Sequence, residues 1–296
     1  MLASKFSEKQ IAYFQLHFCV FLWGFTAILG KLIQIGELPL VWFRVFITCI
    51  SLFFIPQFLN KIKKIEKKYI KKLALIGCLV ATHWLFFYGS IKYSNASIGV
   101  ICMSTSAFFT SIINPIVFKT KFNRKELFFA IFVIIGMILI FNSASFYFLG
   151  IILGLIGALL ASIFTILNKS MVDKVDSLSI TFIELFSGFI LLSILSPLYI
   201  KIFPNVNIYP SQKDFFYLIV LSLLCTTLPF NLSLKALKHV SAFTANFAVN
   251  LEPIYGILMA IAIFKENKEL TLSFYLGAFI ILASVFLQGF LVEKVK

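Results

Sequence analysis

Charged residues are scarce in this sequence of 296 residues. Asp, Glu, Lys and Arg make up 13% of it, and hydrophobic residues 60%, whereas a soluble domain has about 25% charged residues. This scarcity excludes an ordinary soluble domain and predicts a polytopic membrane protein. Acidic residues are scarcer than basic ones, 12 against 26. Because the basic residues gather in short loops between apolar runs, the excess favours the membrane surface, and not nucleic acid, as a partner.

The motifs of several site classes are also missing. The five cysteines all lie in apolar runs and never form CxxC, so we expect small hydrophobic residues and neither disulfides nor metal ligands. HExxH, GxSxG and metal-spaced clusters of Cys, His and carboxylates are absent. We therefore predict no catalytic residue, cofactor or metal site, which argues against an intramembrane enzyme. The first apolar run has no small-residue cleavage site and more than 20 residues, which is too long for a signal-peptide core, so we expect that run to stay as a membrane helix.

Apolar runs fill almost the whole chain. At about 1.5 Å per helical residue, runs of this length cross a hydrocarbon core of about 30 Å. Nothing remains for a soluble domain, so any function must be built from the helices. We predict an all-α integral membrane protein with ten spans, at 11–32, 38–59, 72–91, 95–118, 125–143, 148–169, 179–201, 214–235, 241–264 and 271–292.

Basic residues divide unequally between the two sides that these spans define. Alternate loops and termini carry 19 Lys and Arg on one side and 6 on the other, and Arg44 lies within the second span. Because cytoplasmic loops are rich in Lys and Arg, we predict that both termini and the loop 61–72 are cytoplasmic.

The two halves of the chain resemble each other. An offset of about 146 lays SIKYSNA (90–96) over ALKHVSA (236–242), which indicates an internal duplication. We predict one five-helix repeat over 6–145 and a second over 146–293. Five spans is an odd number, so the second repeat must be inverted relative to the first, as in secondary transporters that bind substrate near the bilayer midplane.

The stretch NFAVNLEPIYG (246–256) places a glutamate and a proline inside an apolar run. Glu252 is expected near the midplane. Pro253 cannot donate a backbone hydrogen bond, so we expect a kink there. In the repeat register these two residues overlay Ser106 and Ala107, which predicts that the first half lacks both the charge and the kink.

Counting residues from the span ends places Arg44 and Glu252 at one depth, as the only charges near the midplane. Ionisable residues at such depth usually face an interior or a wet cavity. We predict that the two form a coupling or charge pair; the alternative is that Glu252 is only a structural partner of Arg44. Glu184, which overlays Arg44 at an offset of about 140, lies near a span end and is expected to hydrate.

Polar and aromatic side chains near the same depth are candidates for substrate binding. His83 could instead bond a neighbouring helix, the aromatic residues could fill the core or face lipid, and the asparagines could bond across helices. The predicted substrate-binding residues are Trp23, His83, Trp84, Ser104, Thr105, Asn246, Asn250 and Tyr255.

Two further patterns concern packing. Gly150, Gly154, Ala158 and Ser162 are each four residues apart and predict a flat stripe for close helix approach. Pro229, in the middle of the eighth span, predicts a second kink.

Several motifs, taken in order, resemble the EamA family of the drug/metabolite transporter superfamily. They are WGF at 23–25, Arg44, YSNAS before the fourth span, and VSAF followed by LEPIYG in the second half. The resemblance covers nearly the whole chain. It implies a ten-helix bundle in which spans 1–4 and 6–9 surround a central cavity, with spans 5 and 10 outside it. It also implies transport of small metabolites such as amino acids.

The function predicted from these features is secondary transport of a small metabolite, an amino acid or related compound, across the bacterial cytoplasmic membrane by alternating access, with export as the favoured direction. The alternative is a lipid-handling or structural membrane protein. The expected partners are a small-molecule substrate and the lipid bilayer, without nucleic acid, and a homodimer is compatible with the sequence.

Overall fold

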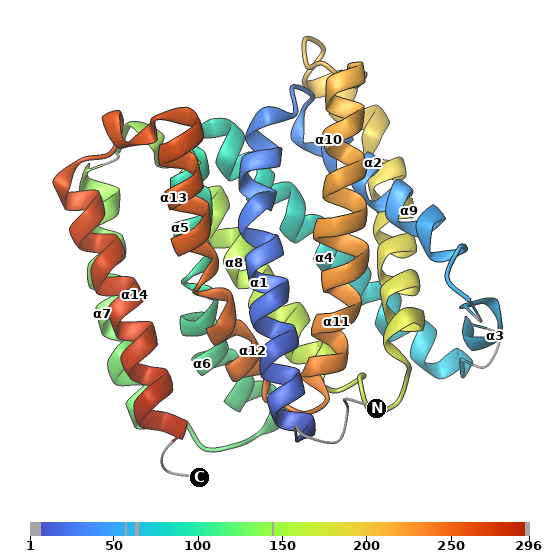
Figure 1. Ribbon diagram of the computed structural model, residues 1–296, viewed down its shortest axis with the longest axis horizontal. Helices are drawn as coiled ribbons and strands as arrows, with labels where there is room; N and C mark the ends of the chain where they lie inside the picture. Colours follow the sequence, from blue (N-terminus) through green and yellow to red (C-terminus); the bar gives the residue numbers. More distant parts are fainter. Residues whose placement is uncertain (1–6, 57, 63–64, 144, 294–296) are drawn as a thin grey trace.

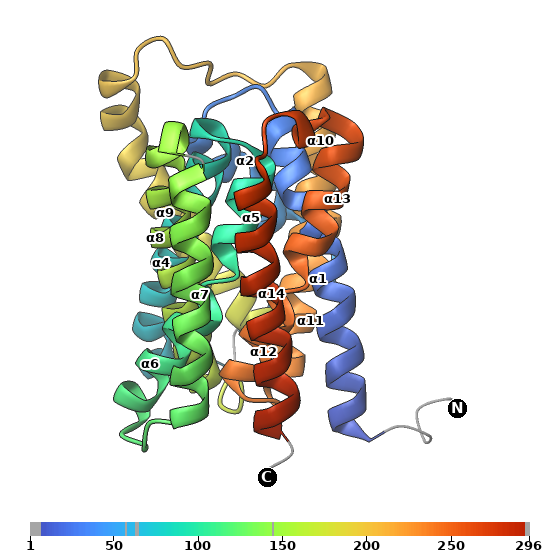
Figure 2. The ribbon, with the colours of Figure 1, turned by 90° about the vertical axis from the view of Figure 1, so that its left-hand side faces the viewer.

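The computed structural model describes residues 7–56, 58–62, 65–143 and 145–293. All regular secondary structure in these ranges is helical, and most helices run along one bundle axis (Figure 1). α1 (Glu8–Leu32) begins and α14 (Leu272–Glu293) ends at the same end of the bundle (Figure 2). We call this the terminal end. The opposite end, which carries the connection between α9 (Ser177–Ile202) and α10 (Gln212–Ser222), is the loop end.

The first half of the chain contributes α1 to α7 and the second half α8 to α14. Six stretches of the described chain, namely α1, α4, α5 with α6, α8, α9 and α10 with α11, are long and apolar enough to cross a membrane. Shorter apolar helices lie within α7, α13 and α14. The remaining elements are α2 (Glu37–Leu52), α3 (Phe58–Ile62), α4 (Lys67–Tyr93), α5 (Ala96–Met103), α6 (Ser106–Phe118), α7 (Arg124–Ser143), η1 (Ser145–Tyr147), α8 (Phe148–Lys169), η2 (Leu223–Thr227), α11 (Leu228–Leu237), α12 (Ala242–Val249), α13 (Glu252–Phe264) and η3 (Glu266–Lys268).

The predicted span 38–59 is too long. α2 ends at Leu52, and turns lead through Pro56 to the short helix α3. A proline inside a helix removes a backbone donor and clashes with the preceding turn, which explains why the helix does not extend to residue 59.

Two other predicted spans are interrupted, and the interruptions are related by the internal repeat. α5 and α6 are separated at 104–105, and α12 and α13 at 250–251, so all four helix boundaries differ by 146 between the halves. The expectation that only the second half is distorted is therefore wrong. The match also supports the duplication, because both breaks occur at equivalent positions although their sequences differ.

The first break does not depend on proline. The backbone N–H of Ser104 and that of Thr105 bond three residues back, to Ile101 and Cys102. The Thr105 hydroxyl donates to the same Cys102 carbonyl at 2.7 Å. Hydroxyl groups that bond nearby carbonyls compete with the helical hydrogen-bond ladder. In the second half, Pro253 lies in the first turn of α13, where its missing N–H costs little.

A third discontinuity joins α10 to α11. The intervening η2 is a π-helical turn, and Pro229 lies in the first turn of α11. The helix is thus interrupted just before Pro229 by a π-bulge, a feature that often marks functional sites, whereas the predicted kink at Pro229 itself stays a prediction.

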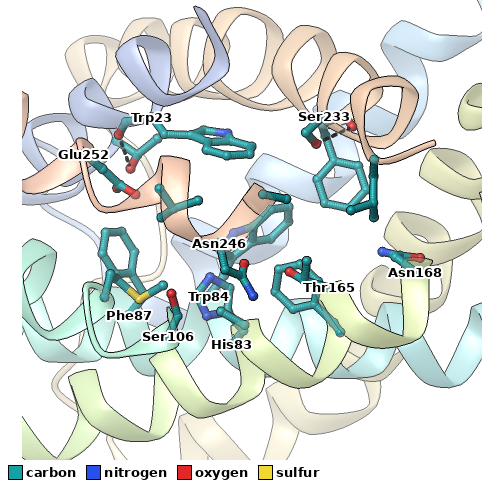
Figure 3. A pocket seen from close by; sticks show the side chains of 18 of the residues that line it. Trp23, His83, Trp84, Phe87, Ser106, Thr165, Asn168, Ser233, Asn246 and Glu252 are labelled. Carbon is teal, nitrogen blue, oxygen red and sulfur yellow. Dashed lines mark hydrogen bonds between the residues drawn. The ribbon is translucent and has the colours of Figure 1, made fainter. Parts of the chain in front are cut away.

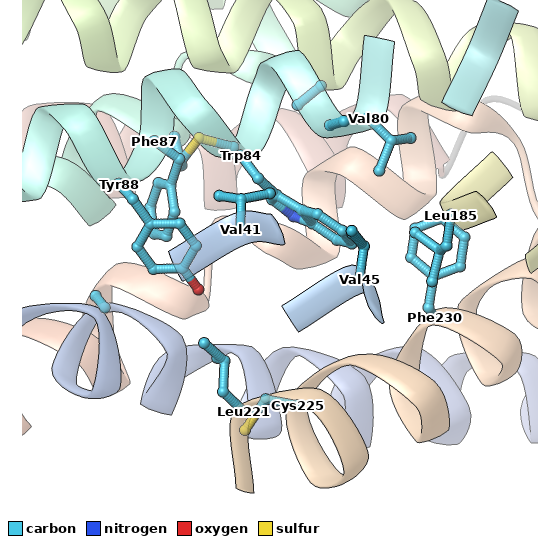
Figure 4. Close-up of a cluster of buried hydrophobic side chains, with 14 of the residues drawn as sticks. Val41, Val45, Val80, Trp84, Phe87, Tyr88, Leu185, Leu221, Cys225 and Phe230 are labelled. Atoms are coloured by element: carbon cyan, nitrogen blue, oxygen red, sulfur yellow. The ribbon is translucent and has the colours of Figure 1, made fainter. Parts of the chain in front are cut away.

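The hydrophobic core joins the two halves. Figure 4 shows Val41 and Val45 of α2 and Trp84 of α4 beside Leu185 of α9 and Cys225 of η2, and all five are buried. By contrast, α7 and α14 lie side by side at one edge of the bundle (Figure 1). This is the outer placement that the family resemblance implies for spans 5 and 10.

The small-residue stripe of α8 is a packing surface. Gly150, Gly154, Ala158 and Ser162 are all buried. A Cβ added at Gly154 would lie 2.7 Å from Cys102 Cβ of α5 and 2.9 Å from Ser90 Oγ of α4. α8 therefore fits closely against two helices of the first half.

Gly154→Leu is expected to destabilise the protein by about 1–3 kcal/mol, the usual cost of overpacking, because neither neighbour can move far. The control is Leu155→Ala, since Leu155 is only partly buried and lines an apolar cavity. Thermal unfolding in detergent measures both. Equal tolerance of the two changes would contradict the packing role of the stripe.

Candidate functional site

A cavity of about 120 Å³ lies between the two halves. Ser106 and Glu252, which begin the helices after the two breaks, are part of its wall. Figure 3 shows Ser106, Glu252 and Asn168 around the same space. Asn168 is the penultimate residue of α8, and Leu237, also in the wall, is the last residue of α11. The cavity therefore extends from the helix breaks toward the terminal end.

Arg44 lines this cavity and is 2% exposed. Its Nε donates to Thr226 Oγ1 at 2.7 Å, Nη1 to the Tyr88 hydroxyl at 2.9 Å, and Nη2 to the Cys225 carbonyl at 3.4 Å. The guanidinium also lies 3.9 Å from the ring centre of Trp84, a cation–π geometry. These bonds use three of five N–H groups, so the π-bulge and α4 together hold the charge in place.

Glu252 lines the same cavity and is 5% exposed. It is the first residue of α13, where the helix dipole favours negative charge. Within the described chain its carboxylate forms no ion pair with Arg44, and no hydrogen bond to it is found. The two charges thus border one cavity without direct contact, and their functional coupling stays a prediction.

Three more predicted residues border the cavity: Trp23, His83 and Asn246. His83 Nδ1 lies 2.8 Å from the backbone oxygen of Gly157 on α8. Asn246 Nδ2 donates to Thr110 Oγ1 at 2.7 Å. These two polar side chains therefore also bond across helices, the alternative role that the sequence had left open. Trp84 lines the cavity as well, with one face against Arg44.

The other four predicted residues lie outside the cavity wall. Ser104 and Asn250 are buried in the two helix breaks, where the hydroxyl of Ser104 and both amide atoms of Asn250 have no hydrogen-bond partner among the described residues. Thr105 borders a second, mostly apolar cavity of about 410 Å³ between α6, α7 and α8. The Tyr255 ring packs edge-on against Phe21 of α1.

Some cavity residues were missed by sequence reasoning. Ser106 overlays Glu252 in the repeat register, so internal symmetry could have identified it. Asn168 gave no such signal, because a polar residue near a span end usually faces the interface. Much of the remaining wall is aromatic, contributed by Phe87, Phe164 and Phe230, which hydropathy does not distinguish from lipid-facing phenylalanines.

Glu266 closes the bundle at the loop end. Its carboxylate is fully buried and pairs with Lys31 Nζ of α1 at 2.7 Å. It also accepts from the backbone N–H groups of Ala96 and Ser97, at 3.1 and 2.9 Å, and from the Ser97 hydroxyl at 2.5 Å. A carboxylate at the N-terminus of α5 is favoured by the helix dipole. We call these four residues the loop-end closure; it joins the second half to α1 and α5.

A metal site is not found in the described part of the chain, which contains no group of three or more His, Cys, Asp or Glu side chains placed to hold an ion. The five cysteines are free thiols. The chemistry of the cavity therefore consists of one buried cation, one buried carboxylate, a few amides and hydroxyls, and aromatic walls.

The fold and the cavity define a multi-pass helical membrane protein with a largely apolar cavity between two repeats, which contains a buried arginine and a buried glutamate. A family model described as EamA-like transporter family matches residues 10–142 and 148–290. The chain belongs to this family and is a membrane transporter; the family is one of transporters, not of enzymes.

Relatives and a solved structure agree with this assignment. An uncharacterized transporter from Clostridium kluyveri is 25% identical over 223 residues, which cover 72% of this chain and 70% of that protein. An uncharacterized transporter from Haemophilus influenzae is 24% identical, covering 90% and 94%. A crystal structure with 10% identity aligns over 98% of both chains with a TM-score of 0.69, which shows a shared fold.

Proposed function

We propose that this protein is a secondary transporter that moves a small metabolite across the bacterial cytoplasmic membrane by alternating access. The observation that carries the proposal is the cavity between the repeats, in which the buried Glu252 carboxylate forms no ion pair or hydrogen bond with the described residues and faces the same space as Arg44. A buried charge without a partner is costly, so its persistence here is best explained by a ligand that binds it.

The helix breaks support the same proposal. Interrupted helices in corresponding positions of two inverted repeats are typical of secondary transporters, whose substrates bind where the half-helices meet. We propose ten spans in two inverted fives, with the five-helix repeats moving relative to each other. Ser106 and Glu252 then occupy equivalent positions beside the substrate.

The cavity chemistry indicates the substrate class. A carboxylate suits an ammonium group, and the two free N–H groups of Arg44 suit a carboxylate. The aromatic wall suits an apolar body. An amino acid or a related compound has these features. The cavity extends toward the terminal end, which the lysine distribution predicts to be cytoplasmic, so substrate enters from the cytoplasm and the proposed direction is export.

One observation favours a second function. The cavity between α6, α7 and α8 is lined almost entirely by apolar residues and fits an acyl chain, as a lipid-handling protein would require. Flux measurements in proteoliposomes distinguish solute transport from lipid handling. Substrate-dependent exchange of amino acids across sealed vesicles supports the transporter, whereas lipid movement without solute flux supports the second function.

The proposed orientation predicts a labelling pattern. In intact cells, on a cysteine-free background, a membrane-impermeant thiol reagent should label Asn207→Cys, at the loop end, and should leave Lys67→Cys, at the start of α4, unlabelled. The expected cause is the excess of Lys and Arg on the cytoplasmic side. Permeabilised cells, in which both variants should react, provide the control. Labelling of Lys67→Cys alone would show that the protein has the opposite orientation in the membrane.

A further inference from the structure

Glu184 of α9 is fully buried, although its position near the terminal end predicts hydration. Its Oε2 accepts a hydrogen bond from Asn168 Nδ2 of α8 at 3.3 Å, and its Oε1 has no hydrogen-bond partner in the part of the chain that the structure describes. The burial results from a close helix crossing. Gly77 of α4 has no side chain, and a Cβ there would lie 2.0 Å from the Glu184 backbone oxygen. The backbones of α4 and α9 therefore pack directly against each other at this turn, without space for water between them.

No positive charge compensates Glu184 among the described residues. The ion pairs found there involve other carboxylates. Arg44 on α2, His83 on α4 and Lys169 on α8 bond other partners. Lys72 and Lys92 on α4 bond Ser170 and Ile33, whereas Lys61, Lys67, Lys68, Lys71 and Lys235 are partly or fully exposed. The thiols of Cys49 and Cys78 and the amide of Asn231 carry no charge. An ionised carboxylate in such a place is strongly disfavoured, so the neutral acid is the form that fits.

The site is one side chain away from the cavity. Asn168 lines the cavity, and its Oδ1 has no hydrogen-bond partner among the described residues. Movement of this one side chain would therefore bring the Glu184 carboxyl group into contact with the cavity.

The site also lies where the two halves meet. α4 belongs to the first repeat and α9 to the second, and they approach through small residues. Besides Gly77, a Cβ added at Gly188 would lie 2.9 Å from Ala81 Cβ. We call Gly77, Ala81 and Gly188 the α4–α9 seam. Any rigid movement of one repeat against the other must shift this seam.

Internal symmetry makes Glu184 the counterpart of Arg44. α2 begins at Glu37 and α9 at Ser177, an offset of 140 that relates the two charged residues. Arg44 has three acceptors around it, whereas Glu184 has a single donor. At these equivalent positions one repeat thus carries a compensated charge, and the other carries an acid that no described residue compensates.

We propose that Glu184 is a proton-binding site, and that its proton keeps the α4–α9 seam closed. The carboxylate takes its proton from cavity water. It returns the proton to water when the repeats move apart and the group becomes hydrated. The proton-binding site at Glu184 is inferred from the packing around it alone. Its role as the coupling site of transport rests on the proposed function.

The proton can be detected without any substrate. Infrared spectra of the reconstituted protein at neutral pH should contain a carboxylic-acid C=O band in the wild type, and this band should lose intensity in Glu184→Gln. The exposed Glu66, paired with Lys68 at the surface, provides the matched control, because Glu66→Gln should leave the band unchanged. Glutamine resembles the protonated acid and can still accept from Asn168, so the variant should fold. A band of the same intensity in Glu184→Gln and wild type would contradict the proposal that Glu184 carries a proton.

Coupling is tested by the pH profile of substrate exchange in proteoliposomes. The wild-type rate should vary across the neutral pH range, and Glu184→Gln should lose this dependence while still binding substrate. A Glu184→Gln profile that follows the wild type would overturn the coupling. Absence of any wild-type flux would reject the proposed function instead, and the infrared result would still decide the proton site.

Discussion

Glu252→Gln is expected to weaken substrate binding by about 10- to 100-fold and to abolish most transport. The carboxylate makes no hydrogen bond or ion pair with the described chain, so its loss removes an interaction with substrate, and a hydrogen bond to a charged group contributes about 1.5–3 kcal/mol. For the same reason the fold should tolerate the change. Substrate-induced thermal shift and flux in proteoliposomes measure the two effects.

Glu66→Gln, an exposed change of the same kind, should leave binding and transport at wild-type levels. Normal transport by Glu252→Gln would remove Glu252 from the mechanism.

A substitution of Arg44 tests separately whether Arg44 and Glu252 are coupled. Arg44→Gln leaves the acceptors on Thr226, Tyr88 and Cys225 without their cation, so it should reduce folded yield more than Glu252→Gln does. If the two charges interact across the cavity, the double variant should recover part of the folded yield without recovering transport. Strictly additive losses of folded yield would indicate that the residues act independently.

The second large effect is expected at the loop-end closure. Glu266→Gln removes the charge that Lys31 and the N-terminus of α5 share. Because the carboxylate is fully buried and accepts four hydrogen bonds, the change should destabilise the protein by about 3 kcal/mol, the lower end for breaking a buried pair. Loss of the closure should also favour opening of the cavity at the loop end.

The opening can be measured with a thiol reagent. Thr26 of α1 lines the cavity, so Thr26→Cys on a cysteine-free background should react faster from the loop end when Glu266→Gln is present. Lys268 lies in the same loop, and its side chain is exposed. Lys268→Gln, which also removes a charge, is therefore the matched control and should change neither the unfolding temperature nor the labelling rate. Unchanged labelling in Glu266→Gln would show that the closure is not a gate.

The contrast between Glu252 and Glu184 shows how far sequence reasoning reaches. Both are glutamates in apolar helices, and counting residues placed Glu252 near the midplane and Glu184 near an end. Depth along a helix follows from the sequence because helical rise is constant. Burial does not, because it depends on which helix packs against that turn. Gly77 lies more than 100 positions from Glu184 along the chain, and their contact exists only in the packed bundle.

Of the two helix breaks, one could be predicted from the sequence and the other could not. Pro253 predicted the second-half distortion, since proline acts on its own helix. The first-half break at Ser104 and Thr105 arises from hydroxyl and backbone hydrogen bonds that many serines and threonines in helices do not form. Only the repeat register, read against the structure, shows that the two breaks are equivalent.

By itself the sequence determined the membrane class, the approximate positions of most helices and the resemblance to EamA transporters, because hydropathy, proline and motif order are local properties of the chain. Tertiary structure decided which polar residues share the cavity, that Arg44 is held by the π-bulge and α4, and that Glu266 closes the loop end. These contacts join residues from different helices, and many of them join the two repeats. Their geometry depends on side-chain packing between helices, which no local pattern encodes.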